Sequence, residues 1–152
     1  MHPQLADLAA RYWDLLMESS PTSATLIGDH RFDDRLEDPS REEEDRLIAA
    51  FDGMVAAATA LDPAALDATD AVTREVLLFE AISQADHLRS RYAEFLVDPM
   101  LGPHMDLVSY IPQLTGTTAE HAAAFVVKAS RVGNAFDHAV DRTIFQRLLG
   151  AS

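Results

Sequence analysis

The sequence contains no cysteine among its 152 residues. Disulfides, thiolate metal sites, iron–sulfur clusters and cysteine nucleophiles are therefore excluded. Lysine is almost absent as well: Lys128 is the single one, and 12 basic side chains stand against 25 acidic ones, giving a net charge of -13. Such a charge repels the phosphates of nucleic acids and of anionic membranes. We expect neither as a partner.

Long apolar runs are also missing. Stretches such as residues 54–58 and 76–79 are far shorter than the roughly 20 apolar residues that cross a bilayer. The N-terminus has no basic region, and Asp7 and Arg11 interrupt the apolar residues that follow, so no secretory signal is indicated. We therefore expect a cytoplasmic protein.

The composition is that of a folded chain, because 48% of the residues are hydrophobic and 24% are charged. A chain of this length is typical of one domain, so residues 1–152 are predicted to form a single helical domain. No pattern indicates a strand hairpin or a repeat of fixed period.

Apolar residues recur at spacings of three and four along most of the chain, which is typical of amphipathic helices. Two sets of residues resemble capping boxes, Ser40 with Glu43 and Thr117 with Glu120. Pro21 suits a first helical turn, and Gly28 suits a left-handed helix end. The predicted helices cover residues 3–17, 21–27, 40–61, 70–92 and 117–148.

The spacing also predicts which side of each long helix is buried. In the third helix the predicted inner face comprises Leu47, Phe51, Met54, Val55, Ala58 and Leu61. In the fourth it comprises Val72, Val76, Phe79, Ile82 or Ser83, and Asp86 or Leu88. In the last it comprises Phe125, Ala129, Val132, Phe136, Val140, Ile144 and Leu148.

Residues 93–116 do not follow a helical pattern, because prolines and glycines interrupt the segment repeatedly. The segment is nevertheless too apolar for a solvated linker, so it should pack against the helices. The predicted fold is thus an all-α bundle of about four main helices with an irregular apolar segment near 93–116.

Several catalytic motifs are absent from the sequence. No histidine is followed by glutamate, which excludes the His-Glu-x-x-His zinc site, and no glutamate has a histidine three residues later, which excludes a carboxylate-bridged di-iron bundle. The nucleophile elbow, the phosphate loop and the dinucleotide-binding glycine motif are missing too. No catalytic residue is therefore predicted.

Two charged clusters have competing interpretations. A site formed by Asp137, His138 and Asp141 on one helix face is one interpretation, but the flanking apolar stripe favours a solvated face paired with Arg142. A hard-cation site at Asp29, His30, Asp33 and Asp34 is one interpretation, yet these residues lack the ligand pattern of a calcium loop. An ordinary acidic surface loop is the favoured interpretation there.

The third candidate lies in the irregular segment, where His104 and Asp106 follow Gly102 and Pro103. Functional side chains are often presented from such rigid loops. The favoured alternative is a packed turn in which His104 bonds unpaired backbone groups. A small-molecule site built from His104, Asp106 and Tyr110 remains a further hypothesis.

Short motifs in a fixed order carry a family resemblance. They include Tyr12-Trp13, Pro21, Ala24-Thr25, Gly28-Asp29, residues 32–36, Leu61-Asp62-Pro63, Thr73-Arg74-Glu75, Gly102-Pro103-His104, Asp106-Leu107, Pro112 and Thr118-Ala119-Glu120. Together they resemble the bacterial family catalogued as domain of unknown function 885, whose members look like helical zinc metallopeptidases.

The resemblance implies a role without hydrolysis. In the family the zinc-binding His-Glu motif lies much further along longer chains, so no zinc ligand is carried over and no cofactor is expected in this chain. It implies an N-terminal helical portion, or a short homologue, whose substrate-cleft residues would be Gly102, Pro103, His104, Asp106 and Tyr110. Its apolar helix faces would meet a second copy or the missing catalytic half.

A different hypothesis needs no missing half. The chain would then be a self-contained helical interaction module without enzymatic activity, whose acidic outer surface receives a basic partner.

Overall fold

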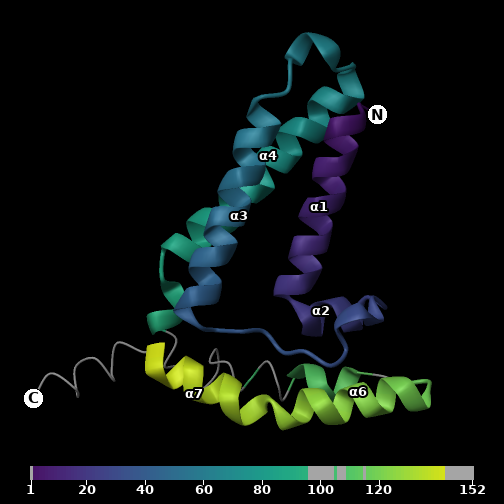
Figure 1. Cartoon of the computed structure of the whole chain (residues 1–152), viewed down its shortest axis with the longest axis vertical. Helices are drawn as coiled ribbons and strands as arrows, with labels where there is room; N and C mark the ends of the chain where they lie inside the picture. The colour runs from purple at the N-terminus through teal and green to yellow at the C-terminus, as the bar shows by residue number, and fades with distance from the viewer. Residues whose placement is uncertain (1, 96–104, 106–108, 115, 143–152) are drawn as a thin grey trace, which may run out of the picture. The chain divides into compact units, whose positions relative to one another are not determined.

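The computed structural model describes residues 2–95, 105, 109–114 and 116–142 (Figure 1). Within these residues there is no β-strand, and the prediction of an all-α fold is confirmed. The α-helices are α1 (Pro3–Ser19), α2 (Pro21–Leu26), α3 (Arg41–Thr59), α4 (Ala68–Arg89), α6 (Ala119–Ser130) and α7 (Val132–Arg142). The described residues also include the 3₁₀ turns η1 (His30–Phe32), η2 (Pro63–Ala65), η3 (Tyr92–Phe95) and η4 (Ile111–Gln113).

The chain divides into two compact units, and each is built from two separate parts of the sequence. The first unit comprises Met1–Leu16 and Glu42–Ser90, and the second comprises Met17–Arg41 and Arg91–Ser152. That residues 1–152 form one domain stays a prediction.

The core of the first unit lies between α1, α3 and α4. One cluster surrounds Phe51, whose ring centroid lies 6.1 Å from that of Tyr12. The inner face predicted for α3 is confirmed, with Val55 half-buried. The buried residues of the two clusters are Leu15, Leu47, Phe51, Met54, Ala81 and Ala85 in one, and Leu5, Leu8, Ala58, Leu61 and Leu77 in the other.

The inner face predicted for α4 is wrong except at Leu88, which is half-buried and packs against the Phe51 cluster. Val72, Val76, Phe79 and Ile82 are 63%, 54%, 68% and 44% exposed, whereas Leu77, Ala81 and Ala85 are buried. The helix is apolar on two opposite sides, since Phe79 and Ala81 lie about 200° apart around a helix of 100° per residue. Periodicity finds both stripes, and packing against α1 and α3 selects the one with small alanines.

Most predicted helix ends agree with the structure. The helix α2 begins at Pro21, and Gly28 beyond its end has a φ of +90°, the left-handed conformation that glycine adopts at low cost. The helix α3 starts directly after Ser40 with glutamates in its first turn. The helix α4 ends before the predicted Tyr92, because Arg91 takes a positive φ of 54°.

The last predicted helix is interrupted. Its cap is Thr118 instead of Thr117, and the chain divides at Arg131 into α6 and α7. At that point the amide of Arg131 bonds to the carbonyl of Lys128 three residues back, and Gly133, a poor helix former, follows. Along the predicted stripe Phe125, Val132 and Phe136 are half-buried and Ala129 and Val140 are exposed, while Ile144 and Leu148 lie outside the described residues.

In the described parts of the chain, no helix combines the length and the apolar character needed to cross a membrane.

Candidate functional site

The loop after α2 begins with the 3₁₀ turn η1, which contacts between Asp29 and Arg31 stabilise. The carboxylate of Asp29 accepts the backbone N–H of Arg31 at 3.2 Å and its guanidinium Nε at 2.9 Å. The bond from the Arg31 side chain lowers the pKa of Asp29. This arrangement fixes His30 at the start of the turn and Asp33 directly after its end.

Asp33 is the buried centre of the second unit's polar cluster, with only 3% of its surface exposed. The hydroxyl of Thr25 donates to its Oδ1 at 2.7 Å, and Nδ1 of His30 lies 2.9 Å from its Oδ2. Both carboxylate oxygens are thereby positioned, and a buried carboxylate is retained only when it is satisfied in this way.

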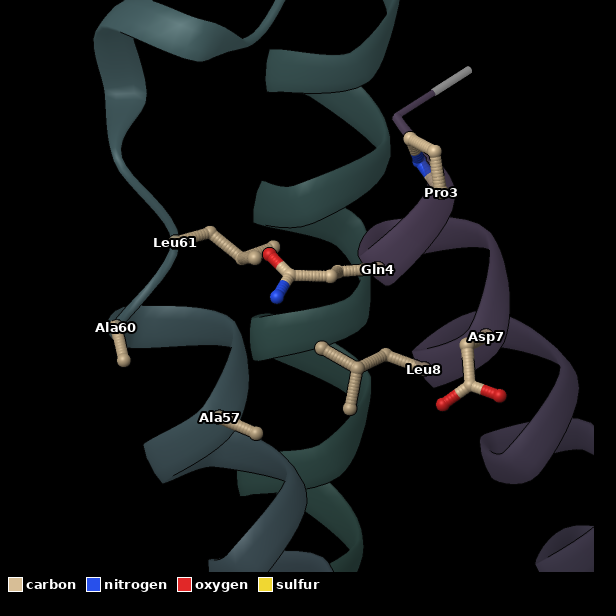
Figure 2. A pocket seen from close by; sticks show the side chains of 7 residues that line it. All are labelled: Pro3, Gln4, Asp7, Leu8, Ala57, Ala60 and Leu61. Atoms are coloured by element: carbon tan, nitrogen blue, oxygen red, sulfur yellow. The ribbon is translucent and has the colours of Figure 1, made fainter.

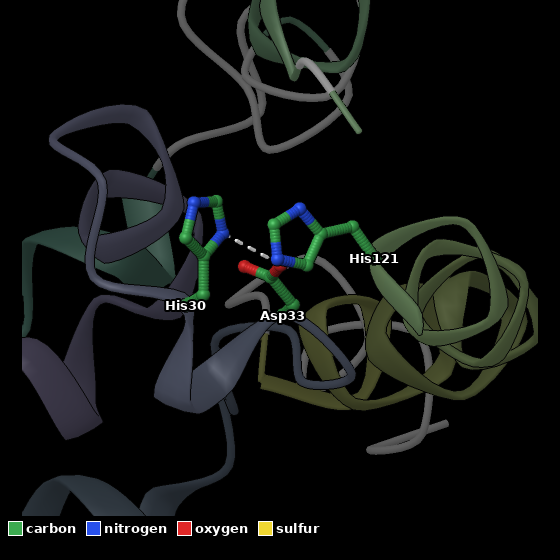
Figure 3. A group of neighbouring side chains, drawn as sticks. All are labelled: His30, Asp33 and His121. Atoms are coloured by element: carbon green, nitrogen blue, oxygen red, sulfur yellow. Dashed lines mark hydrogen bonds and ion pairs between the residues drawn. The ribbon is translucent and has the colours of Figure 1, made fainter. Parts of the chain in front are cut away.

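His121 joins this pair from the first turn of α6. The hydroxyl of Thr118 caps the helix by accepting the backbone N–H of His121 at 3.1 Å. The imidazoles of His30 and His121 stack with centroids 4.0 Å apart and planes 17° apart. His30, Asp33 and His121 each offer one ligand atom, and these atoms lie within 4.8 Å of one another (Figure 3).

Lys128 lies about two turns after His121 in α6 and borders the same cluster. It is 3% exposed, and its Nζ lies 3.4 Å from Oγ1 of Thr25. Burial lowers the pKa of Lys128, and the charges of Glu37, Asp33 and Asp34 offset part of that effect. A chain of polar groups therefore runs from Lys128 through Thr25 to Asp33.

Two further contacts extend the cluster along α6 and α7. The guanidinium of Arg131 lies 3.5 Å from Asp34, and Nδ1 of His138 lies 3.4 Å from Asp38. Burial would raise the pKa of Asp38, but hydrogen bonds from Ser40 and His138 bring it below its usual value. Arg131 at the end of α6 and His138 of α7 thus face acidic residues of the loop. We call these contacts the polar seam: Thr25, His30, Asp33, Asp34 and Asp38 with His121, Lys128, Arg131 and His138.

The structure places the members of the two charged clusters predicted from sequence in different surroundings. Asp29 and Asp34 are ion-paired near the surface, but Asp33 is buried, so the interpretation as an ordinary surface loop is wrong for Asp33. His138 pairs with Asp38 of the loop, while Asp137 and Asp141 are exposed. The side chain of Arg142 is not among those described, so its predicted pairing stays a prediction.

The candidate cleft of the irregular segment stays a prediction. Gly102, Pro103, His104 and Asp106 lie outside the described residues. Tyr110, the remaining member of that set, is described, and its side chain is exposed.

A pocket of about 460 Å³ lies in the first unit between the beginning of α1 and the end of α3. Figure 2 shows Gln4, Leu8 and Leu61 pointing toward one another across it. Asp7 is the ionisable residue of its lining, and this carboxylate lies 3.8 Å from the guanidinium of Arg11 at the surface. The lining therefore lacks the convergent polar groups typical of a ligand site.

The sequence pattern does not identify His121, Thr25 or Lys128 as residues of the site. His121 and Lys128 are seven residues apart and so share a helix face, which is the one local signal. Nothing in that spacing indicates a contact with a loop about 90 residues earlier in the sequence.

The family model described as "Bacterial protein of unknown function (DUF885)" matches residues 21–145. The match spans α2, the polar seam and both last helices. Comparisons with curated proteins and with solved structures gave no match.

Proposed function

We propose, since the chain belongs to the DUF885 family of bacterial proteins of unknown function, that it is a non-catalytic helical portion or short homologue of a metallopeptidase-like protein. Its role would be to wall a substrate cleft while another part performs hydrolysis. A helical zinc hydrolase requires the motif His-Glu-x-x-His. No histidine in this sequence is followed by glutamate, so the sequence supports a role without hydrolysis.

The exposed stripe of α4 carries the proposal. Val72, Val76 and Phe79 lie on the side opposite the buried Leu77 and Ala81. A helix that is apolar on opposite sides is typical of one covered on both, and in the first unit only one side is covered by α1 and α3. The stripe is therefore proposed to meet the missing catalytic half, or a second copy when that half is absent.

The alternative is a self-contained acidic interaction module without enzymatic activity. The closed clusters around Phe51 and Leu5 favour it, because they give the first unit a core of its own. The net charge of -13 would then select a basic partner.

Light scattering of the full chain in EDTA, over a range of concentrations, distinguishes the two. We expect the wild type to self-associate, and the Val76→Lys/Phe79→Lys variant to be monomeric. The matched control is Ala49→Lys/Ala56→Lys, which adds the same charge at exposed positions of α3 and should associate like the wild type. A wild-type monomer that unfolds cooperatively would contradict the proposal and support the self-contained module.

A further inference from the structure

We propose that His30, Asp33 and His121 form a binding site for a divalent transition-metal ion, and that Zn²⁺ is the ion this ligand set favours. The site is separate from the hydrolytic centre that the missing half would carry, and it would tie the loop after α2 to the start of α6. It differs from the hard-cation hypothesis for the loop, because two of its three ligands are imidazoles and one of these comes from α6.

The donor set selects the class of ion. Imidazole nitrogens suit zinc and its neighbours in the first transition row, whereas calcium and magnesium prefer ligand sets made entirely of oxygen. Two histidines and one aspartate provide three protein ligands, so water would complete a tetrahedral zinc site.

To bind one zinc ion, the three ligand atoms must move slightly closer together. Ligands about 2.0–2.2 Å from zinc lie roughly 3.3 Å from one another in a tetrahedron, whereas the three atoms here lie within 4.8 Å. Side-chain rotation can supply this difference, since all three residues present their ligand atoms to the same space (Figure 3).

One imidazole must also turn. A ring nitrogen binds a metal along its lone pair, which lies in the ring plane, so rings stacked at 4.0 Å cannot both point at one ion. His121 can rotate without losing a hydrogen bond at Nδ1, because that buried nitrogen has no partner within the described residues. His30 can adjust as well, since it is exposed.

The carboxylate is already oriented by its surroundings. Thr25 donates to Oδ1 of Asp33, which leaves Oδ2 on the side of His30. Hydrogen bonds of this kind hold carboxylate ligands in place at known metal sites. Lys128 is the competing cation, because its ammonium group interacts with the same carboxylate.

Zinc titration calorimetry on the full chain, freed of metal with EDTA and then dialysed, tests the site. We expect one Zn²⁺ per chain, an affinity about tenfold or more weaker in His121→Gln, and little response to Mg²⁺. The matched control is His87→Gln, which removes an exposed histidine in the last turn of α4, outside the polar seam, and should leave zinc affinity unchanged. Circular dichroism establishes that each variant is folded.

Cobalt provides a second measurement. Co²⁺ in place of zinc should give the strong visible absorption of a four-coordinate site, and His121→Gln should lose it. Absence of zinc binding, equal losses in the two variants, or equal binding of Mg²⁺ would each overturn the proposal. The outcome is independent of the α4 stripe, whose test is performed in EDTA.

Discussion

The Nζ of Lys128 lies 3.4 Å from the hydroxyl oxygen of Thr25, a residue 103 positions earlier in the sequence. The contact joins the end of α6 to α2 within the second unit, and it buries the chain's single lysine among acidic residues. A buried ammonium group destabilises the fold when its surroundings compensate only in part.

Stability should therefore depend on the protonation of Lys128. Burial lowers its pKa in the folded state below the value of 10.5, so the unfolded chain binds more protons between these two pKa values. The free energy of unfolding should rise with pH through that window. Urea denaturation from about pH 7 to about pH 10 should show this slope in the wild type but not in Lys128→Met. Parallel curves for the two proteins would contradict the prediction.

Two phenylalanines test the assignment of the core. Phe51 is 2% exposed and Phe79 is 68% exposed. Phe51→Ala should reduce the free energy of unfolding by about 3–5 kcal/mol because it leaves a cavity, whereas Phe79→Ala should change it by less than about 0.5 kcal/mol. Chemical denaturation at low protein concentration measures both. A cost for Phe79→Ala as large as that for Phe51→Ala would place the buried face of α4 where the sequence pattern put it.

The start of α6 can be tested with two adjacent threonines. The hydroxyl of Thr118 accepts the backbone N–H of His121, so Thr118→Ala should cost about 1 kcal/mol. Thr117→Ala should cost little, since Thr117 precedes the cap. Thermal unfolding followed by circular dichroism compares the two variants. A larger loss of stability in Thr117→Ala than in Thr118→Ala would instead support Thr117, the cap predicted from sequence.

Two glycines should respond in opposite directions. Gly28→Ala should destabilise by about 1–2 kcal/mol, because φ is +90° there and a Cβ is strained even though no atom lies within 4 Å of it. Gly53→Ala should stabilise by roughly 0.5–1 kcal/mol, because Gly53 lies within α3 with open space around it. Urea midpoints provide the comparison. A neutral Gly28→Ala would mean that the turn after α2 relaxes freely.

The parts of the fold that were predictable have local causes. Pro21, Gly28 and the glutamates after Ser40 act on their own helix ends, so the sequence is enough to place α2 and the start of α3. The buried face of α4 has no such cause. Apolar residues occupy two sides of that helix, and only packing against α1 and α3 decides between Phe79 and Ala81.

The polar cluster likewise combines a local part, which the sequence predicts, with a part that depends on tertiary packing. His30 and Asp33 are close in sequence, so their proximity was predictable from the motif. His121 reaches them through the tertiary fold, and its neighbours along α6 give no sign of that contact. The burial of Asp33 was missed for the same reason, because Thr25 and the residues of α6 cover a loop that is acidic enough to read as exposed.

The alternation of the two units along the sequence constrains how the protein can fold during synthesis. Every residue of the first unit has been translated once Ser90 is reached, whereas Met17–Arg41 must wait for Arg91–Ser152. At about 5–20 residues per second this delay is roughly 3–12 s. Until His121 and Lys128 have been translated, the polar residues from Thr25 to Asp38 lack both of these partners, so the nascent loop is open to a chaperone or a protease.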